Sequence, residues 1–162
     1  MALWRDASAA AGFLDPQTYL ATGNMLTETT MSSEAARAAQ SELLARLGLP
    51  EMVVPVLRTP ETLAGLVAAD PFPDASRDRP SETGVYFFAD DAPDLQWIGD
   101  YDGPERLAVV DRHLIVDYGG QISASPKLPR LIEKRSGTVT ARNWSTLRGL
   151  AERGAARQQR QF

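Results

Sequence analysis

The chain has 162 residues, of which 43% are hydrophobic, and this is enough apolar side chain to bury one core or two small ones. It contains no cysteine, which excludes disulfides, thiolate nucleophiles and cysteine-ligated metals or iron–sulfur clusters. Its formal net charge is -4, but residues 1–119 carry 8 basic and 19 acidic side chains, whereas residues 120–162 carry 9 basic and 2 acidic ones.

This asymmetry makes the C-terminal third a cationic block. Such a block is typical of a surface for an anionic ligand or nucleic acid, and equally of an intramolecular match to an acidic remainder. The apolar runs are too short to span a membrane, and no apolar leader follows the start of the chain. We therefore expect a cytoplasmic protein without a membrane partner.

Hydrophobic periodicity and capping residues predict alternating helices and strands in the first half. The expected helices cover residues 2–12, 33–47 and 60–70, and the expected strands cover residues 17–22, 25–28 and 52–57. Gly23-Asn24 is a two-residue hairpin signal between the first two strands. Pro55 cannot donate to a ladder, so it predicts that the third strand lies at a sheet edge.

A stretch rich in Pro and Asp, residues 71–83, predicts a linker, and a second set of elements follows it. The expected strands cover residues 84–89, 106–110, 113–118 and 138–141, and the expected helices cover residues 92–99, 125–134 and 144–153. This order is that of a ferredoxin-like plait, and the first half repeats it without the opening strand.

The predicted fold class is therefore α+β, with two tandem ferredoxin-like (α/β plait) units. We expect the first unit, with its trailing helix, at residues 1–70 and the linker at residues 71–83. The second unit, with its C-terminal helix, should cover residues 84–155, and residues 156–162 should form a frayed tail.

Four ordered motifs resemble one family. They are Thr18-Tyr19-Leu20-Ala21-Thr22-Gly23-Asn24, Asp70-Pro71-Phe72-Pro73, Pro126-Lys127-Leu128 and Thr140-Ala141-Arg142-Asn143-Trp144. Together they resemble the domain-of-unknown-function 1697 family of bacterial proteins. The resemblance implies two ferredoxin-like units and no established activity.

The chain departs from that family in two places. Members usually begin with a strand and a Gly-rich turn, and this chain starts just after that point, as an N-terminally shortened member would. The strand at residues 52–57 would then lack its usual neighbour. Either the start was placed too far downstream, or a different strand, for example from a partner chain, fills the gap. Pro126 also replaces the serine that precedes Lys-Leu in the family.

The residues that could bind a ligand lie mostly in the cationic block. They are Asn24, Ser125, Lys127, Arg142, Asn143 and Trp144. Ser125 and Lys127 open a helix after a Gly pair, which suits an anion, and Ser125 equally suits an N-cap. Arg142, Asn143 and Trp144 offer a bidentate cation, an amide and a stacking face. The alternative is that Asn143 caps the last helix, Trp144 anchors it in the core and Arg142 pairs with an acid.

Two further interpretations stay open for single groups. Asn24 could face a ligand or simply complete its turn. His113 is the only histidine, and the Asp90-Asp91 cluster lacks the calcium-loop pattern, so we expect no metal and no cofactor. No catalytic motif is recognisable, and whether the chain is an enzyme stays open.

Three functions are compatible with the sequence. The first is a non-catalytic module that binds an anionic small molecule, nucleotide or nucleic acid through the C-terminal half. The second is a small metal-free enzyme that uses Lys127 and Arg142 on an anionic substrate. The third is a structural or interaction protein that forms a homo-oligomer through an exposed edge of the first sheet.

Overall fold

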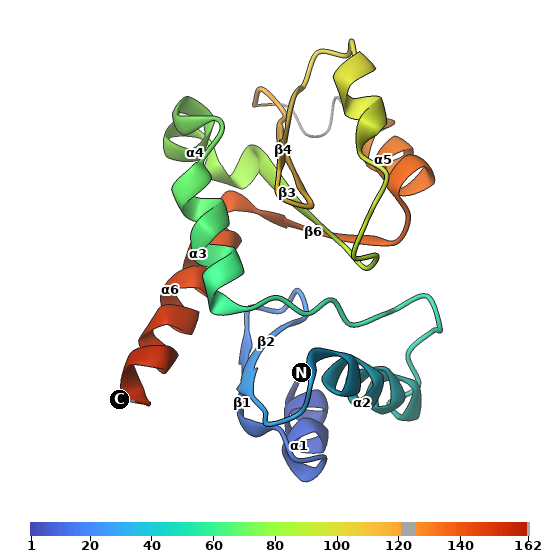
Figure 1. The fold of residues 1–162 in the computed structure, drawn as a ribbon, viewed down its shortest axis with the longest axis vertical. Helices are drawn as coiled ribbons and strands as arrows, with labels where there is room; N and C mark the ends of the chain where they lie inside the picture. Colours follow the sequence, from blue (N-terminus) through green and yellow to red (C-terminus); the bar gives the residue numbers. More distant parts are fainter. Residues whose placement is uncertain (121–125, 162) are drawn as a thin grey trace. The chain divides into compact units, whose positions relative to one another are not determined.

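The structure is a computed structural model that describes residues 1–120 and 126–161. It is a mixed α+β protein with two small antiparallel sheets (Figure 1). The chain divides into two compact units, Met1–Arg58 and Thr59–Phe162, and each is described by itself.

The first unit consists of two helices and a hairpin, and α1 packs against both α2 and β1. Its elements are α1 (Ala2–Ala10), β1 (Leu14–Tyr19), β2 (Asn24–Glu28) and α2 (Ser33–Arg46). Ser32 begins α2 because its hydroxyl accepts a hydrogen bond from the Ala35 amide at 3.2 Å. The core of this unit gathers around Phe13, Ala36 and Leu43.

The hairpin differs from the predicted one in its turn. Tyr19 pairs with Asn24, so residues 20–23 form a four-residue loop in place of the expected two-residue turn. Leu20 and Gly23 adopt φ values of 60° and 83°, which the loop needs to reverse direction. The prediction of a strand at residues 52–57 is wrong: these residues belong to no strand, and none of the described strands pairs with them.

The second unit contains a four-stranded antiparallel sheet in the order β4-β5-β3-β6. Its elements are α3 (Pro60–Ala69), α4 (Pro73–Asp78), the 3-10 helix η1 (Pro80–Glu82), β3 (Thr83–Phe88), the 3-10 helix η2 (Gln96–Asp100), β4 (Arg106–Val110), β5 (His113–Asp117), α5 (Leu128–Ser136), β6 (Val139–Asn143) and α6 (Trp144–Arg160).

Helix α5 covers one face of this sheet. Tyr86 and Phe88 of β3 and Leu114 of β5 share a core with Leu128 and Ile132 of α5. Because side chains alternate along a strand, Val85 and Phe87 point to the opposite face. Helices α3 and α6 lie side by side in the same unit (Figure 1). They approach closely at Gly154, where an added Cβ would lie 3.2 Å from Pro60 Cβ.

Several boundaries of the second unit differ from those expected. Residues 71–83, interpreted as a linker, contain α4 and η1, and each of these helices starts at a proline whose missing amide needs no partner there. The short helix around Trp97 is 3-10 rather than α. Helix α3, assigned above to the first unit, packs on α6 of the second. Helix α6 continues to Arg160, so most of the expected frayed tail is helical.

Candidate anion-binding site

Asn24 has a structural role in the first unit. Its side chain is 8% exposed. Its amide nitrogen donates to the Tyr19 carbonyl and to the Thr22 hydroxyl, both at 2.9 Å. These bonds close the hairpin loop, which agrees with the interpretation of Asn24 as a turn residue.

Asn143 and Trp144 stabilise the start of α6. The Asn143 carbonyl oxygen Oδ1 accepts a hydrogen bond from the Thr146 amide at 2.9 Å, which makes Asn143 the N-cap. Trp144 is 1% exposed and therefore offers no stacking face to a ligand. Ser125, the other expected capping residue, lies outside the described residues.

Arg142 and Lys127 lie on different sides of the second sheet. Arg142 pairs with Val85 across the β3–β6 ladder, so its side chain leaves the face opposite α5, whereas Lys127 is the N-cap of α5. Arg142 Nη1 donates to the Thr140 hydroxyl at 2.8 Å and to the Ala141 carbonyl at 2.7 Å. Burial lowers the pKa of its guanidinium. The structure therefore does not bring Lys127 and Arg142 together at one ligand.

Lys127 instead contributes to a groove along α5. This groove, hereafter the α5 groove, has a volume of about 420 Å³ and is lined by Tyr101, Lys127, Leu128, Arg130, Leu131 and Lys134. The three cationic side chains are exposed, and no carboxylate of the described residues forms an ion pair with them. Residues spaced by three and four positions share one helix face, so these cations form a single row.

Tyr101 is a fixed aromatic wall of the α5 groove. Its hydroxyl donates to the Glu105 carboxylate, and its ring meets Trp97 edge-on with centroids 6.2 Å apart. Burial and the hydrogen bond to Glu105 raise the pKa of Tyr101 to about 12. Gly103 passes so close to the phenol that it has no room for a Cβ, which further fixes the ring.

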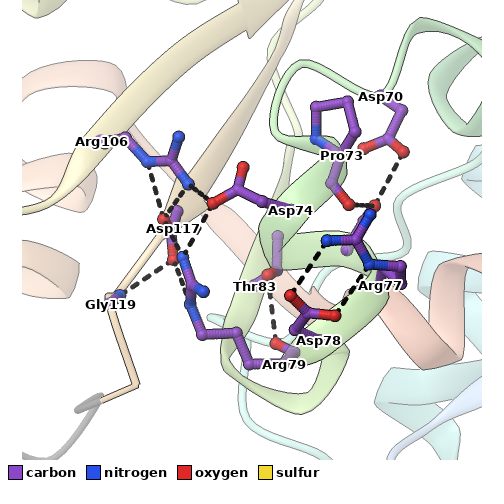
Figure 2. A network of polar contacts seen from close by, with 11 residues as sticks. Asp70, Pro73, Asp74, Arg77, Asp78, Arg79, Thr83, Arg106, Asp117 and Gly119 are labelled. Atoms are coloured by element: carbon purple, nitrogen blue, oxygen red, sulfur yellow. Dashed lines mark hydrogen bonds and ion pairs between the residues drawn. The ribbon is translucent and has the colours of Figure 1, made fainter.

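A second polar cluster holds the ends of strands β4 and β5 (Figure 2). The Asp117 carboxylate is 3% exposed and accepts hydrogen bonds from Arg79 Nη2 at 2.7 Å, Arg106 Nε at 2.8 Å and the Gly119 amide at 2.9 Å. Arg106 also donates to Asp74 of α4 at 2.7 Å.

The charges of this cluster are balanced, because two guanidinium groups face two carboxylates. Burial opposes ionisation of Asp117, but the hydrogen bonds from Arg79, Gly119 and Arg106 prevail and lower its pKa to about 2. The cluster thus anchors α4 to the sheet and leaves no net charge for a ligand. Sequence analysis missed it, although the hairpin register that pairs Val110 with His113 also pairs Arg106 with Asp117.

Neither a cluster of metal ligands nor a membrane-spanning helix is found among the residues that the structure describes. Within the described residues no group of three or more His, Asp or Glu side chains is arranged to hold a metal ion. His113 is fully buried and packs edge-on against Phe87, with ring centroids 5.4 Å apart. None of the described helices is both long and apolar enough to cross a bilayer.

The larger part of the chain matches a known protein family. Residues 1–114 match a family described as a protein of unknown function, DUF1697. The match covers the motifs at Thr18–Asn24 and Asp70–Pro73 and ends within β5. No curated protein and no solved structure is significantly similar to the chain.

Proposed function

Because the chain belongs to the DUF1697 family, whose description assigns no activity, we propose a function from the site itself: a non-catalytic module that binds a phosphate-bearing anion in the α5 groove. The observation that carries the proposal is the row of Lys127, Arg130 and Lys134 beside an aromatic wall. The location in the C-terminal part of the chain agrees with the cationic block of residues 120–162.

The charge of helix α5 supports an anion as the ligand of the groove. Helix α5 and its N-cap carry four cationic side chains and one acidic side chain, so this helix is locally positive although the chain as a whole is acidic. Leu128 and Leu131 line the groove between the cations. An apolar lining excludes some of the water that would otherwise screen the charges, which strengthens their attraction for a phosphate.

The enzyme alternative is less well supported. It requires Lys127 and Arg142 to act on the same substrate, and the β3–β6 register puts Arg142 on the sheet face that α5 does not cover. Among the residues that line the groove, Tyr101 is the titratable group other than the cations, and its pKa of about 12 keeps the phenol protonated at neutral pH. A protonated phenol that donates to Glu105 suits binding better than general base catalysis.

Titration with inorganic pyrophosphate and with a mononucleotide tests this proposal. At low salt, about 50 mM, we expect amide chemical-shift changes centred on residues 127–134 of the full chain. Arg130→Ala should weaken the response. Arg135→Ala is the matched control, because Arg135 is exposed on the same helix but does not line the groove. Shifts that are absent, or equally reduced by both substitutions, would exclude the site.

A second candidate function is assembly through a sheet edge in the first unit. Val54 and its neighbours Met52 and Val53 are apolar, belong to no helix or strand, and are between 39% and 81% exposed. The two-stranded sheet of this unit has an open edge on each strand among the described residues. An exposed apolar segment and open strand edges in the same unit favour pairing with another chain, here a second copy.

We also infer that the second unit is a ferredoxin-like plait and that the first is a reduced version of it. If the strands β3, β4, β5 and β6 are numbered 1 to 4 in chain order, the sheet reads 4-1-3-2 from its β6 edge. This is the strand order of a ferredoxin-like plait, which supports the inference. The 3-10 helix η2 stands where a plait has its first helix. The two strands of the first unit correspond to the hairpin of such a plait.

A further inference from the structure

We propose that the ligand of the α5 groove is single-stranded nucleic acid, with successive phosphates along the cationic row and a base against Tyr101. This inference rests on the proposed anion-binding function and narrows it to one class of polyanion. It is argued from the shape of the row, from the fixed aromatic ring and from the apolar lining between them.

The cations form a line rather than a ring. Lys127 and Lys134 are seven residues apart, which is about 10 Å along a helix axis, and Arg130 lies between them. A compact anion could contact all three only if the two lysines bent inward, and ordering such long side chains costs conformational entropy. An extended strand presents phosphates in a row, so each cation can contact its own phosphate without bending.

Tyr101 supplies a stacking surface that is already in place. Its ring is held by the hydrogen bond to Glu105, by edge contact with Trp97 and by the close approach of Gly103. A fixed ring loses little side-chain entropy on binding, which favours affinity. Stacking of a base on an aromatic side chain contributes about 1–3 kcal/mol and tolerates every base.

The apolar lining favours a single strand over a duplex. A duplex presents phosphates and sugars to an exposed helix face, whereas its bases are stacked inside, out of reach of Tyr101, Leu128 and Leu131. Asp102 lies near Tyr101, and its negative charge helps to raise the pKa of the phenol. The Tyr101 end of the groove is therefore less positive than the end formed by α5. The base therefore belongs at the Tyr101 end and the phosphates along α5.

Fluorescence anisotropy with a labelled oligothymidylate of about ten nucleotides tests the inference on the full chain. Affinity is measured over a salt series and compared with the mononucleotide, an abasic oligomer of the same length and a duplex. Three phosphate contacts predict a slope of log affinity against log salt of about −2. Arg130→Ala should reduce that slope by about 0.7, whereas the control Arg135→Ala should leave it unchanged.

We expect the oligothymidylate to bind at least about ten-fold more tightly than the mononucleotide and the abasic oligomer, as one stacked base of about 1.4 kcal/mol requires. Tyr101→Phe keeps the ring and should retain this preference, whereas Tyr101→Leu should abolish it. A mononucleotide that binds as tightly as the oligomer would overturn the inference and leave the proposed function intact. Equal or tighter binding of the abasic oligomer or the duplex would overturn it in favour of a general polyanion site. If no probe binds, both fail.

Discussion

Asp117→Asn should destabilise the second unit, because it removes the one buried charge that holds Arg79 and Arg106. The pKa of Asp117 is about 2 in the folded chain against an ordinary 3.8. That difference corresponds to about 2.5 kcal/mol of unfolding free energy at neutral pH. The side chains of Arg79 and Arg106 are 29% and 46% exposed, so water can partly replace the lost carboxylate. We therefore expect a loss of about 2 kcal/mol.

The loss should depend on pH with a definite sign. The folded-state pKa of Asp117 is depressed, so its stabilisation is fully present above pH 3.8 and disappears as the pH falls toward 2. The difference between the wild-type chain and Asp117→Asn should accordingly be constant from pH 7 to about pH 4 and shrink below it.

Differential scanning calorimetry measures this difference directly. For a chain of this length, about 2 kcal/mol lowers the Tm by roughly 4–8 °C. Asp78→Asn is the matched control, because Asp78 pairs with the adjacent Arg77 at the exposed surface and its loss should leave the Tm almost unchanged. An unchanged Tm for Asp117→Asn at pH 7, or an equal loss at pH 7 and pH 2, would refute the assignment of Asp117 as an anchor.

Two further predictions concern a helix cap and a sheet edge. Asn143→Ala removes the cap of α6 and should lower the free energy of unfolding, measured by urea denaturation, by about 1 kcal/mol. Asn143→Asp can still accept the hydrogen bond from the Thr146 amide and should lower it much less. Equal losses for the two variants would contradict the capping role. If the first unit assembles through its exposed apolar segment, light scattering should find a dimer that Val54→Lys converts to a monomer, and a wild-type chain that stays monomeric at high concentration would exclude this assembly.

The elements that could be predicted from sequence are those with local signals. The hairpin at residues 106–110 and 113–118 matches β4 and β5 because its apolar strands flank a short turn. Thr59-Pro60 marked the start of α3 because the threonine hydroxyl accepts from the Thr62 amide at 3.2 Å. The family resemblance is confirmed by the match over residues 1–114.

The parts that could not be predicted depend on contacts between distant residues. Residues 71–83 looked like a linker because their Pro and Asp content disfavours regular structure locally. They are ordered because Asp74 and Arg79 bond to Arg106 and Asp117, which lie more than 25 residues further along the chain. The segment at residues 52–57 has the composition of a strand, but a strand forms only where a second strand hydrogen-bonds to it, and composition does not show whether such a partner exists.

The candidate site, too, could be predicted only in the parts that have local sequence signals. The place of Lys127 at a predicted helix start indicates a binding role, but Tyr101 reaches the α5 groove only through the fold, since 25 residues separate the two. Arg142 was selected for its chemistry, and the alternation of side chains along β6 decides which face it occupies. The sequence could indicate the cationic helix, but not which cations share a surface with an aromatic ring.

The junction of β6 and α6 has a mechanical consequence. Asn143 is both the last residue of the strand and the cap of the helix, so no loop separates the two elements. Any tilt of helix α6 would therefore strain the backbone hydrogen bonds between β6 and β3. Strand and helix should open and close as one cooperative segment, and their amide protons should exchange with solvent at a common rate.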